Sequence, residues 1–180
     1  MAKHVLKPHP TTLPLAVEGV EAELYATDAD GILVRFVVHG GELFLPERAT
    51  PARRHGLWQT TCFEIFLQPL KSKKYYEFNF SPSTQWAAYS FDDYRIGMQE
   101  LILPIDPLIE PDGSESSFVI EVDLDLAAVP DVPLHMGLSA VVEERGGHKS
   151  YWALAHPDLD RPDFHDPACF TLELPPPLAE

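Results

Sequence analysis

Apolar and polar residues alternate with a period of two along much of the chain, the pattern of β-strands that bury one face. Two further segments are apolar enough to be strands, and residues 75–80 and 85–91 are expected to pair as a hairpin. The segments with clear alternation are residues 32–39, 62–68, 75–81 and 118–124, and the two further ones are residues 134–142 and 151–156.

Helical periodicity is nearly absent from the sequence. The only candidate is residues 124–129, which Pro130 would end after about one turn. The 18 prolines are spread along the chain, as expected for turns and edges between strands. About ten short strands with almost no helix predict an all-β fold, a two-sheet antiparallel β-sandwich of jelly-roll-like type. A length of 180 residues without repeats or a linker predicts a single domain over residues 1–180.

The net charge and the hydropathy of the chain limit the classes of molecule that it is expected to bind. The chain has 13 Lys and Arg against 28 Asp and Glu, a net charge of -15, which disfavours nucleic acid and anionic membranes. No apolar run approaches the roughly 20 residues of a membrane span, and the N-terminus lacks an apolar signal core, so a cytoplasmic location is expected. Cys62 and Cys169 lack CxxC spacing and are expected to be buried thiols.

Polar residues out of phase with the apolar pattern form the first candidate site. Glu64, Glu77 and Asn79 are expected on one outer face of neighbouring strands. Trp86 is assigned to the same face, because the alternate residues from Ala87 onward are interpreted as the buried set of its strand. An indole beside carboxylates and an amide suits a sugar ring. The alternative is a core tryptophan with ordinary solvated polar residues.

The C-terminal loop region contains a second candidate site. Trp152, His156 and His165 lie close together in the sequence, with carboxylates nearby, and could hold a ligand. Their spacing matches no established metal motif, so no metal is expected, and local turn capping is the alternative. Arg95 follows a predicted strand and could reach a ligand with its guanidinium, or form a surface ion pair.

Several sequence blocks resemble the DOMON-like proteins, a superfamily that also contains the family 9 carbohydrate-binding modules. The strongest block, residues 56–67, reads GLWQTTCFEIFL and is followed by YYEFNFSP at residues 75–82. Later blocks look like a small bacterial subgroup of the superfamily. These later blocks are WAAY at residues 86–89, YWALAHP at residues 151–157 and PDFH at residues 162–165.

The resemblance implies a β-sandwich that binds sugars in some members and haem in others. It implies a sugar clamp of two tryptophans, Trp86 with Trp152 or Trp58 with Trp152. It also implies a ligand groove at Glu64, Asn79, Trp86, Arg95 and Trp152. We therefore expect a non-catalytic domain without a cofactor that binds a small molecule, with a sugar-like ligand favoured. The expected ligand-binding residues are Trp58, Glu64, Glu77, Asn79, Trp86, Arg95, Trp152, His156 and His165.

Three other functions stay open at this point. A haem-binding domain would need an axial pair such as a methionine with a histidine. A glycoside-acting enzyme could use Glu64 and Glu77 as acid and base, although the sequence has no phosphate loop, GxSxG or HExxH motif. A sheet face with exposed aromatics could instead bind a protein partner or form a homodimer. The candidate haem ligands are Met98, Met136, His135, His156 and His165.

Overall fold

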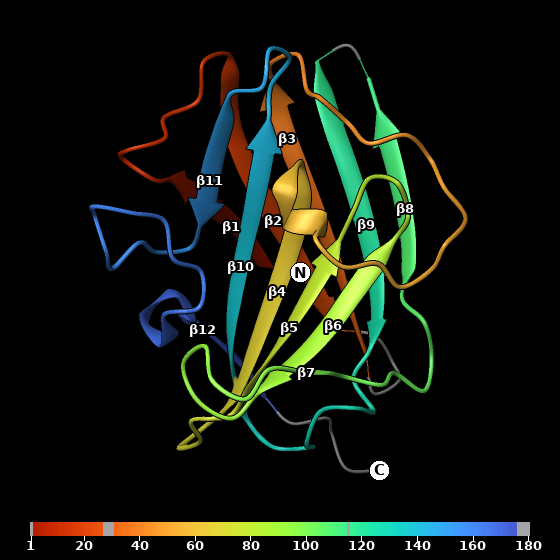
Figure 1. Cartoon of the computed structure of the whole chain (residues 1–180), viewed down its shortest axis with the longest axis vertical. Helices are drawn as coiled ribbons and strands as arrows, with labels where there is room; N and C mark the ends of the chain where they lie inside the picture. The colour runs from red at the N-terminus through yellow and green to blue at the C-terminus, as the bar shows by residue number, and fades with distance from the viewer. Residues whose placement is uncertain (1, 27–30, 115, 176–180) are drawn as a thin grey trace.

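The computed structural model describes residues 2–26, 31–114 and 116–175, which form two antiparallel β-sheets facing each other (Figure 1). Sheet A consists of β1 (Ala2–Pro8), β2 (Val17–Ala26), β3 (Gly31–Gly40), β9 (Ser117–Asp125) and β8 (Leu108–Gly113). Sheet B consists of β7 (Gln99–Glu100), β6 (Trp86–Phe91), β5 (Tyr75–Phe80), β4 (Cys62–Pro69), β10 (Leu134–Glu143) and β11 (Lys149–Ala153), with β12 (Leu172–Leu174) paired to β10. Two short 3-10 helices, η1 (Leu57–Gln59) and η2 (Pro167–Cys169), complete the described elements.

Strand β1 joins the two sheets into one strongly curled structure. Its first part pairs with β2 in sheet A, and its last two residues, Lys7 and Pro8, pair with β11 in sheet B. Among the described strands, β7 and β8 end the continuous strand order, and β12 pairs only with β10. Sheet B lies in front of β2 and β3 in Figure 1, so this view looks onto its outer face.

The core lies between the inner faces of the two sheets and contains the apolar sets that the alternation predicts. Phe36 of sheet A and Phe63 of sheet B meet across it, with ring centroids 5.2 Å apart. Burial of each such side chain stabilises the fold by about 1.5–3 kcal/mol. The expected all-β antiparallel sandwich is confirmed. Its core includes Ile32, Val34, Phe36, Val38, Phe63, Ile65, Leu67, Tyr76, Phe78, Phe80, Phe118, Ile120, Val122 and Leu124.

Trp86 and Trp152 also belong to this core, which corrects the face expected for Trp86. Trp86 pairs with Phe80 across the hairpin and Trp152 pairs with Ala140. Directly paired residues point to the same face of a sheet, and both partners point inward. The indole N–H of Trp152 donates to Ser150 Oγ at 2.8 Å.

The remaining expectations about local structure hold with small changes. Residues 124–129 form no helix, because the first two belong to β9 and the rest make a turn in which Val129 N–H donates to the carbonyl of Leu126 at 2.8 Å. Cys62 and Cys169 are free and buried, as expected, and burial raises the pKa of the Cys169 thiol to about 12. No helix within the described ranges is long and apolar enough to cross a bilayer.

Candidate functional site

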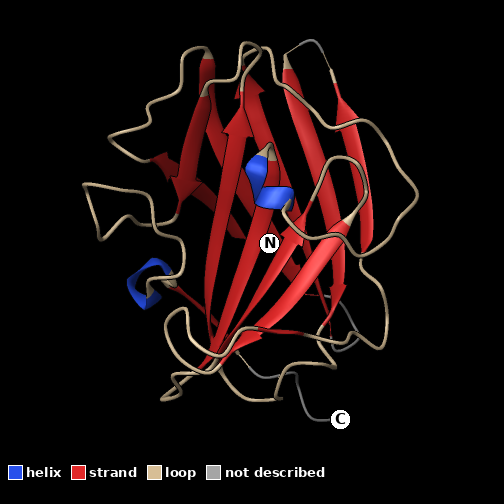
Figure 2. Ribbon diagram, in the orientation of Figure 1, coloured by secondary structure: helices blue, strands red, loops and turns tan. Residues whose placement is uncertain are grey.

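The outer face of sheet B is covered by other parts of the chain. Residues 154–171, between β11 and β12, lie beside β10, and η1 lies over β4 (Figure 2). Phe170 stacks on Phe66 with ring centroids 5.4 Å apart. A Cβ atom at Gly137 would lie only 2.5 Å from the Phe170 ring, so glycine at this position lets the loop approach β10. The face therefore forms a second, smaller apolar cluster, outside the main core.

Three polar side chains lie within this covered face, and we call Glu64, Glu77 and Asn79 the polar cluster. Glu64 of β4 is paired directly with Asn79 of β5, and Glu77 is two residues before Asn79 on the same face. Asn79 Nδ2 donates to Glu77 Oε1 at 2.9 Å, and Ser139 Oγ donates to Glu64 Oε2 at 3.5 Å. Asn79 Oδ1 is buried and has no hydrogen-bond partner among the described residues. Glu64 and Glu77 keep 4% and 6% of their surface exposed, and Asn79 keeps 1%.

His165 connects the covering loop to the polar cluster. Its Nε2 lies 3.5 Å from Glu77 Oε2, and its Nδ1 shares a hydrogen bond of 2.8 Å with the hydroxyl of Tyr75. Burial, with a smaller contribution from the charge of Arg95, lowers the pKa of His165 to about 4. The imidazole is therefore neutral near pH 7 and does not balance the charge of Glu77.

Asp163 holds the covering loop against the loop that follows β6. Its carboxylate accepts hydrogen bonds from Arg95 Nη2 at 2.7 Å, from the hydroxyl of Tyr94 and from His165 N–H at 3.1 Å. Burial alone would raise the pKa of Asp163, but the bonds from Tyr94 and Arg95 outweigh it and the pKa is lowered. Arg95 thus pairs with Asp163, and this pair positions His165 beside the polar cluster.

The two carboxyl groups of the cluster are strongly perturbed. Burial raises the pKa of Glu77 to about 7, against the opposing effect of its hydrogen bond from Asn79. Burial, followed by repulsion from Glu77, raises the pKa of Glu64 well above its usual value. Because two nearby buried carboxylates resist being ionised together, the pair retains a proton near neutral pH. The cluster can therefore accept hydrogen bonds and exchange a proton with a ligand.

Of the expected ligand-binding residues, Glu64, Glu77, Asn79 and His165 come together, with Arg95 linked to them through Asp163. The alternation of polar and apolar positions predicted the shared face of the first three. His165 lies near these three residues because of how the loop between β11 and β12 folds. The sequence pattern does not indicate that fold.

The aromatic residues are placed differently from the sequence-based expectation. Trp58 lies on η1 at this outer face and is 54% exposed, whereas Trp86 and Trp152 point into the core. Neither expected tryptophan clamp is therefore formed, because both clamps need Trp152 on the outer face. His156 lies at the junction with β1, where its Nε2 bonds to the carbonyl of Lys7 at 2.8 Å.

Tyr75 and Ser139 were not among the expected site residues, and Asp163 was considered only as one of the carboxylates near His156 and His165. The alternation pattern could have indicated Tyr75 and Ser139, because each is in phase with the outward residues of its strand. Ser139 is also paired with Glu64. Asp163 lies in a loop, where no periodicity indicates which way a side chain points.

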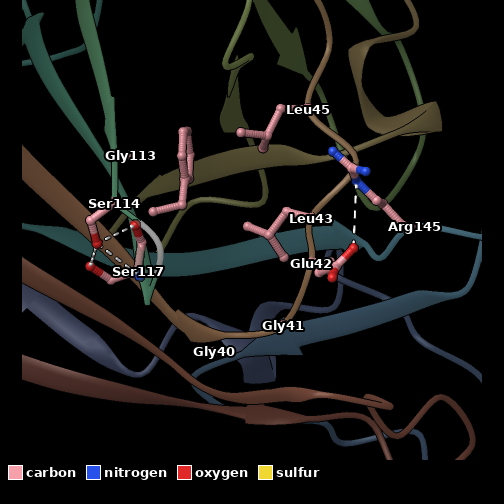
Figure 3. A pocket seen from close by; sticks show the side chains of 10 residues that line it. Gly40, Gly41, Glu42, Leu43, Leu45, Gly113, Ser114, Ser117 and Arg145 are labelled. Carbon is pink, nitrogen blue, oxygen red and sulfur yellow. Dashed lines mark hydrogen bonds and ion pairs between the residues drawn. The ribbon is translucent and has the colours of Figure 1, made fainter.

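A hollow of about 360 Å³ lies elsewhere, at one end of the sandwich, lined by residues that include Leu43, Ser114, Ser117 and Arg145 (Figure 3). Some of its polar groups have partners within the protein. Ser114 and Ser117 bond to each other through their hydroxyls at 3.1 Å, and Arg145 lies 3.8 Å from Glu42.

The parts of the chain that the structure describes contain few candidate residues for binding a metal ion or haem. No group of three or more His, Cys, Asp or Glu side chains among them is arranged to hold a metal ion. Of the two methionines considered for haem, Met136 is fully buried in the core between the sheets and Met98 is 61% exposed.

Comparison with known proteins places the fold but not a sequence family. No protein-family model and no curated protein matches the sequence. A proposed carbohydrate-binding protein from Bacteroides uniformis ATCC 8492 has a similar structure, with a TM-score of 0.68, 14% identity and coverage of 94% of this chain and 84% of that chain. A family 9 carbohydrate-binding module from Caldicellulosiruptor kristjanssonii, solved with cellotriose, has a TM-score of 0.57 and 12% identity, covering 94% of this chain and 79% of that one. The chain therefore has the fold of the family 9 carbohydrate-binding modules.

Proposed function

We propose that the chain is a non-catalytic domain that binds a saccharide at the outer face of sheet B. The polar cluster carries this proposal, because its oxygen atoms have few protein donors although they lie within an aromatic face. Sugar rings need such a combination, since their hydroxyls require polar partners and their C–H faces pack on flat apolar surface. The module of the same fold that was solved with cellotriose supports a sugar as the ligand.

Trp58 and Arg95 supply the exposed part of the proposed site. Leu57 of η1 packs into the apolar cluster of this face, while the neighbouring indole of Trp58 remains 54% exposed. The side chain of Arg95 is 51% exposed, so its guanidinium retains donors for a ligand hydroxyl besides its bond to Asp163. The indole would stack on the sugar while the polar cluster accepts its hydroxyl hydrogens.

Isothermal titration calorimetry with glucose, xylose and cellobiose tests the proposal. We expect at least one of these sugars to bind, and Trp58→Ala to weaken its binding by about tenfold or more, which is about 1.4 kcal/mol. Leu108→Ala is the matched control, because Leu108 is also exposed but lies on β8 at the free edge of sheet A. Its affinity should equal that of the wild type.

Other results of these measurements would contradict this proposal. An affinity unchanged by Trp58→Ala would place the sugar elsewhere, and no binding of any tested sugar would contradict saccharide binding. A dimer in light scattering that Trp58→Ala dissociates would instead favour a protein-interaction role for this face.

An enzymatic function is the second candidate, because a carboxyl group with a raised pKa beside another carboxylate is also what a glycosidase requires. Incubation with nitrophenyl glycosides distinguishes the two functions. Binding without release of nitrophenol supports the proposal. Hydrolysis that Glu64→Gln or Glu77→Gln abolishes would make the domain an enzyme.

A further inference from the structure

The polar cluster is rich in hydrogen-bond acceptors and poor in donors. Asn79 Nδ2 is directed to Glu77 Oε1 at 2.9 Å, which fixes the orientation of the amide and leaves its Oδ1 turned away from that bond. In the part of the chain that the structure describes, Oδ1 has no hydrogen-bond partner, although Asn79 is 99% buried. The hydroxyl of Ser139 reaches Glu64 only at 3.5 Å, a long hydrogen bond. A ligand at this position therefore meets mainly unsatisfied oxygen atoms.

Within the described part of the chain, no lysine or arginine is paired directly with the cluster. Arg95 is the nearby cation, and its guanidinium is bound to Asp163 at 2.7 Å. Its charge lowers the pKa of Glu64 and Glu77, but burial raises both by more. The other basic neighbour, His165, is neutral near pH 7 because burial lowers its pKa to about 4. Tyr75, Tyr89 and Cys62, which also face the cluster, are neutral there as well, since burial raises the pKa of each.

We propose that the polar cluster selects sugars that carry a free ammonium group over neutral sugars of the same shape. This inference rests on the proposed saccharide-binding function and names the class of sugar. An ammonium group offers three N–H donors and one positive charge, which match several acceptors and a buried carboxylate. A hydroxyl offers a single donor and no charge. The net charge of -15 on the chain adds a long-range attraction for cations.

Binding of an ammonium group should displace a proton from the cluster. Without ligand, burial keeps the pKa of Glu77 at about 7 and that of Glu64 also raised, so the pair holds a proton at neutral pH. A bound cation favours the ionised carboxylates and releases that proton. Affinity for the amino sugar should therefore rise as the pH increases from about 5 to 7, while the sugar amine is still largely protonated. Affinity for a neutral sugar should not rise in this way.

Calorimetric titration with D-glucosamine, D-glucose and N-acetyl-D-glucosamine at about pH 6.5 tests the inference, since the first differs from the others in its charged amine. We expect glucosamine to bind about tenfold or more tightly than glucose, and acetylation of the amine to remove the gain. The binding enthalpy of glucosamine should depend on the ionisation enthalpy of the buffer, because a proton is released. This measurement uses the wild-type protein and is independent of how any variant folds.

A matched pair of variants locates the selectivity. Glu77→Gln should reduce the ratio of glucosamine to glucose affinity, whereas Glu110→Gln, an exposed glutamate on β8, should leave the ratio unchanged. Equal affinities for glucosamine and glucose would overturn the inference and leave saccharide binding intact. A preference that persists in Glu77→Gln and shows no proton release would also overturn it. Failure of all three sugars to bind would contradict both the inference and the proposed function.

Discussion

The outer faces of sheets A and B come from strands with similar polar–apolar alternation, yet they have opposite environments. On sheet A the outward side chains form partly exposed ion pairs, such as Lys3 with Glu21 at 2.6 Å and Arg35 with Glu23 at 3.3 Å. On sheet B the outward Glu64 and Glu77 are buried under a loop, and neither is ion-paired with a lysine or arginine of the described residues. A polar residue that alternates with apolar ones is therefore outward-facing in both sheets, but its solvation depends on what covers the face.

The largest expected loss of stability comes from removing an aromatic side chain from the covered outer face of sheet B. Phe66 is buried between Phe170 and His165, with ring centroids 5.4 and 5.3 Å away. Phe66→Ala should lower the free energy of unfolding by about 3–5 kcal/mol, as a substitution in the main core does. Urea denaturation measures this, with Phe36→Ala as the reference for the main core. A loss below about 1 kcal/mol would mean that the loop contributes little to the packing of this face.

The pH dependence of stability tests the buried carboxylates of the same face. The pKa of Glu77 is raised from 4.5 to about 7, so its favourable contribution is complete below about pH 4.5 and is lost as the pH rises through 7. The lowered pKa of His165, about 4, has the opposite effect, with stability lost as the pH falls from 6.5 towards 4. Glu77→Gln should therefore gain stability over the wild type as the pH increases, by up to roughly 3 kcal/mol.

Denaturation of both proteins at intervals between about pH 4 and 8 gives the difference directly. The exposed Glu110→Gln is the control and should follow the wild-type curve. A constant difference between Glu77→Gln and the wild type at every pH would contradict the raised pKa of Glu77.

A smaller loss of stability is expected from a substitution at the residue that holds the covering loop in place. Asp163→Asn keeps the shape of the side chain but removes the charge that binds Arg95 and Tyr94. We expect a loss of about 1–3 kcal/mol, towards the lower end because Arg95 is half exposed and its charge is screened. Asp158→Asn, which changes an exposed carboxylate with only local partners, should have a smaller effect. If the two variants are equally stable, Asp163 does not hold the loop.

The smallest loss of stability should come from a substitution on the outer face of sheet A. Arg35 lies 3.3 Å from Glu23 and 4.0 Å from Glu121, and both pairs are partly open to solvent. Arg35→Ala should cost about 0–1 kcal/mol and the cost should decrease in high salt. Measured by urea denaturation in low and high salt, a cost near that of Phe66→Ala would remove the contrast between the two faces.

The period-two pattern alone predicted the sandwich, the hairpin of β5 and β6, and the shared face of Glu64, Glu77 and Asn79. It could do so because side chains on a strand alternate between faces regardless of what lies further away. It could not assign Trp86, because Trp86 and Ala87 are both apolar and either could start the buried set. Only the pairing of Trp86 with Phe80 decides that it points inward.

The sequence by itself indicated seven of the strands, β3 to β6 and β9 to β11, and in most of these which side chains share a face, but it did not indicate β1, β2, β7, β8 or β12. Tertiary structure alone decided that the outer face of sheet B is covered, that Asp163 holds the loop there and that His165 lies beside Glu77. Those contacts join residues 68 to 90 positions apart, including Tyr75 with His165. Local alternation carries no information about such distant partners. Burial by the loop is also what raises the pKa of Glu64 and Glu77, and two ordinary strand glutamates thereby become the candidate ligand site.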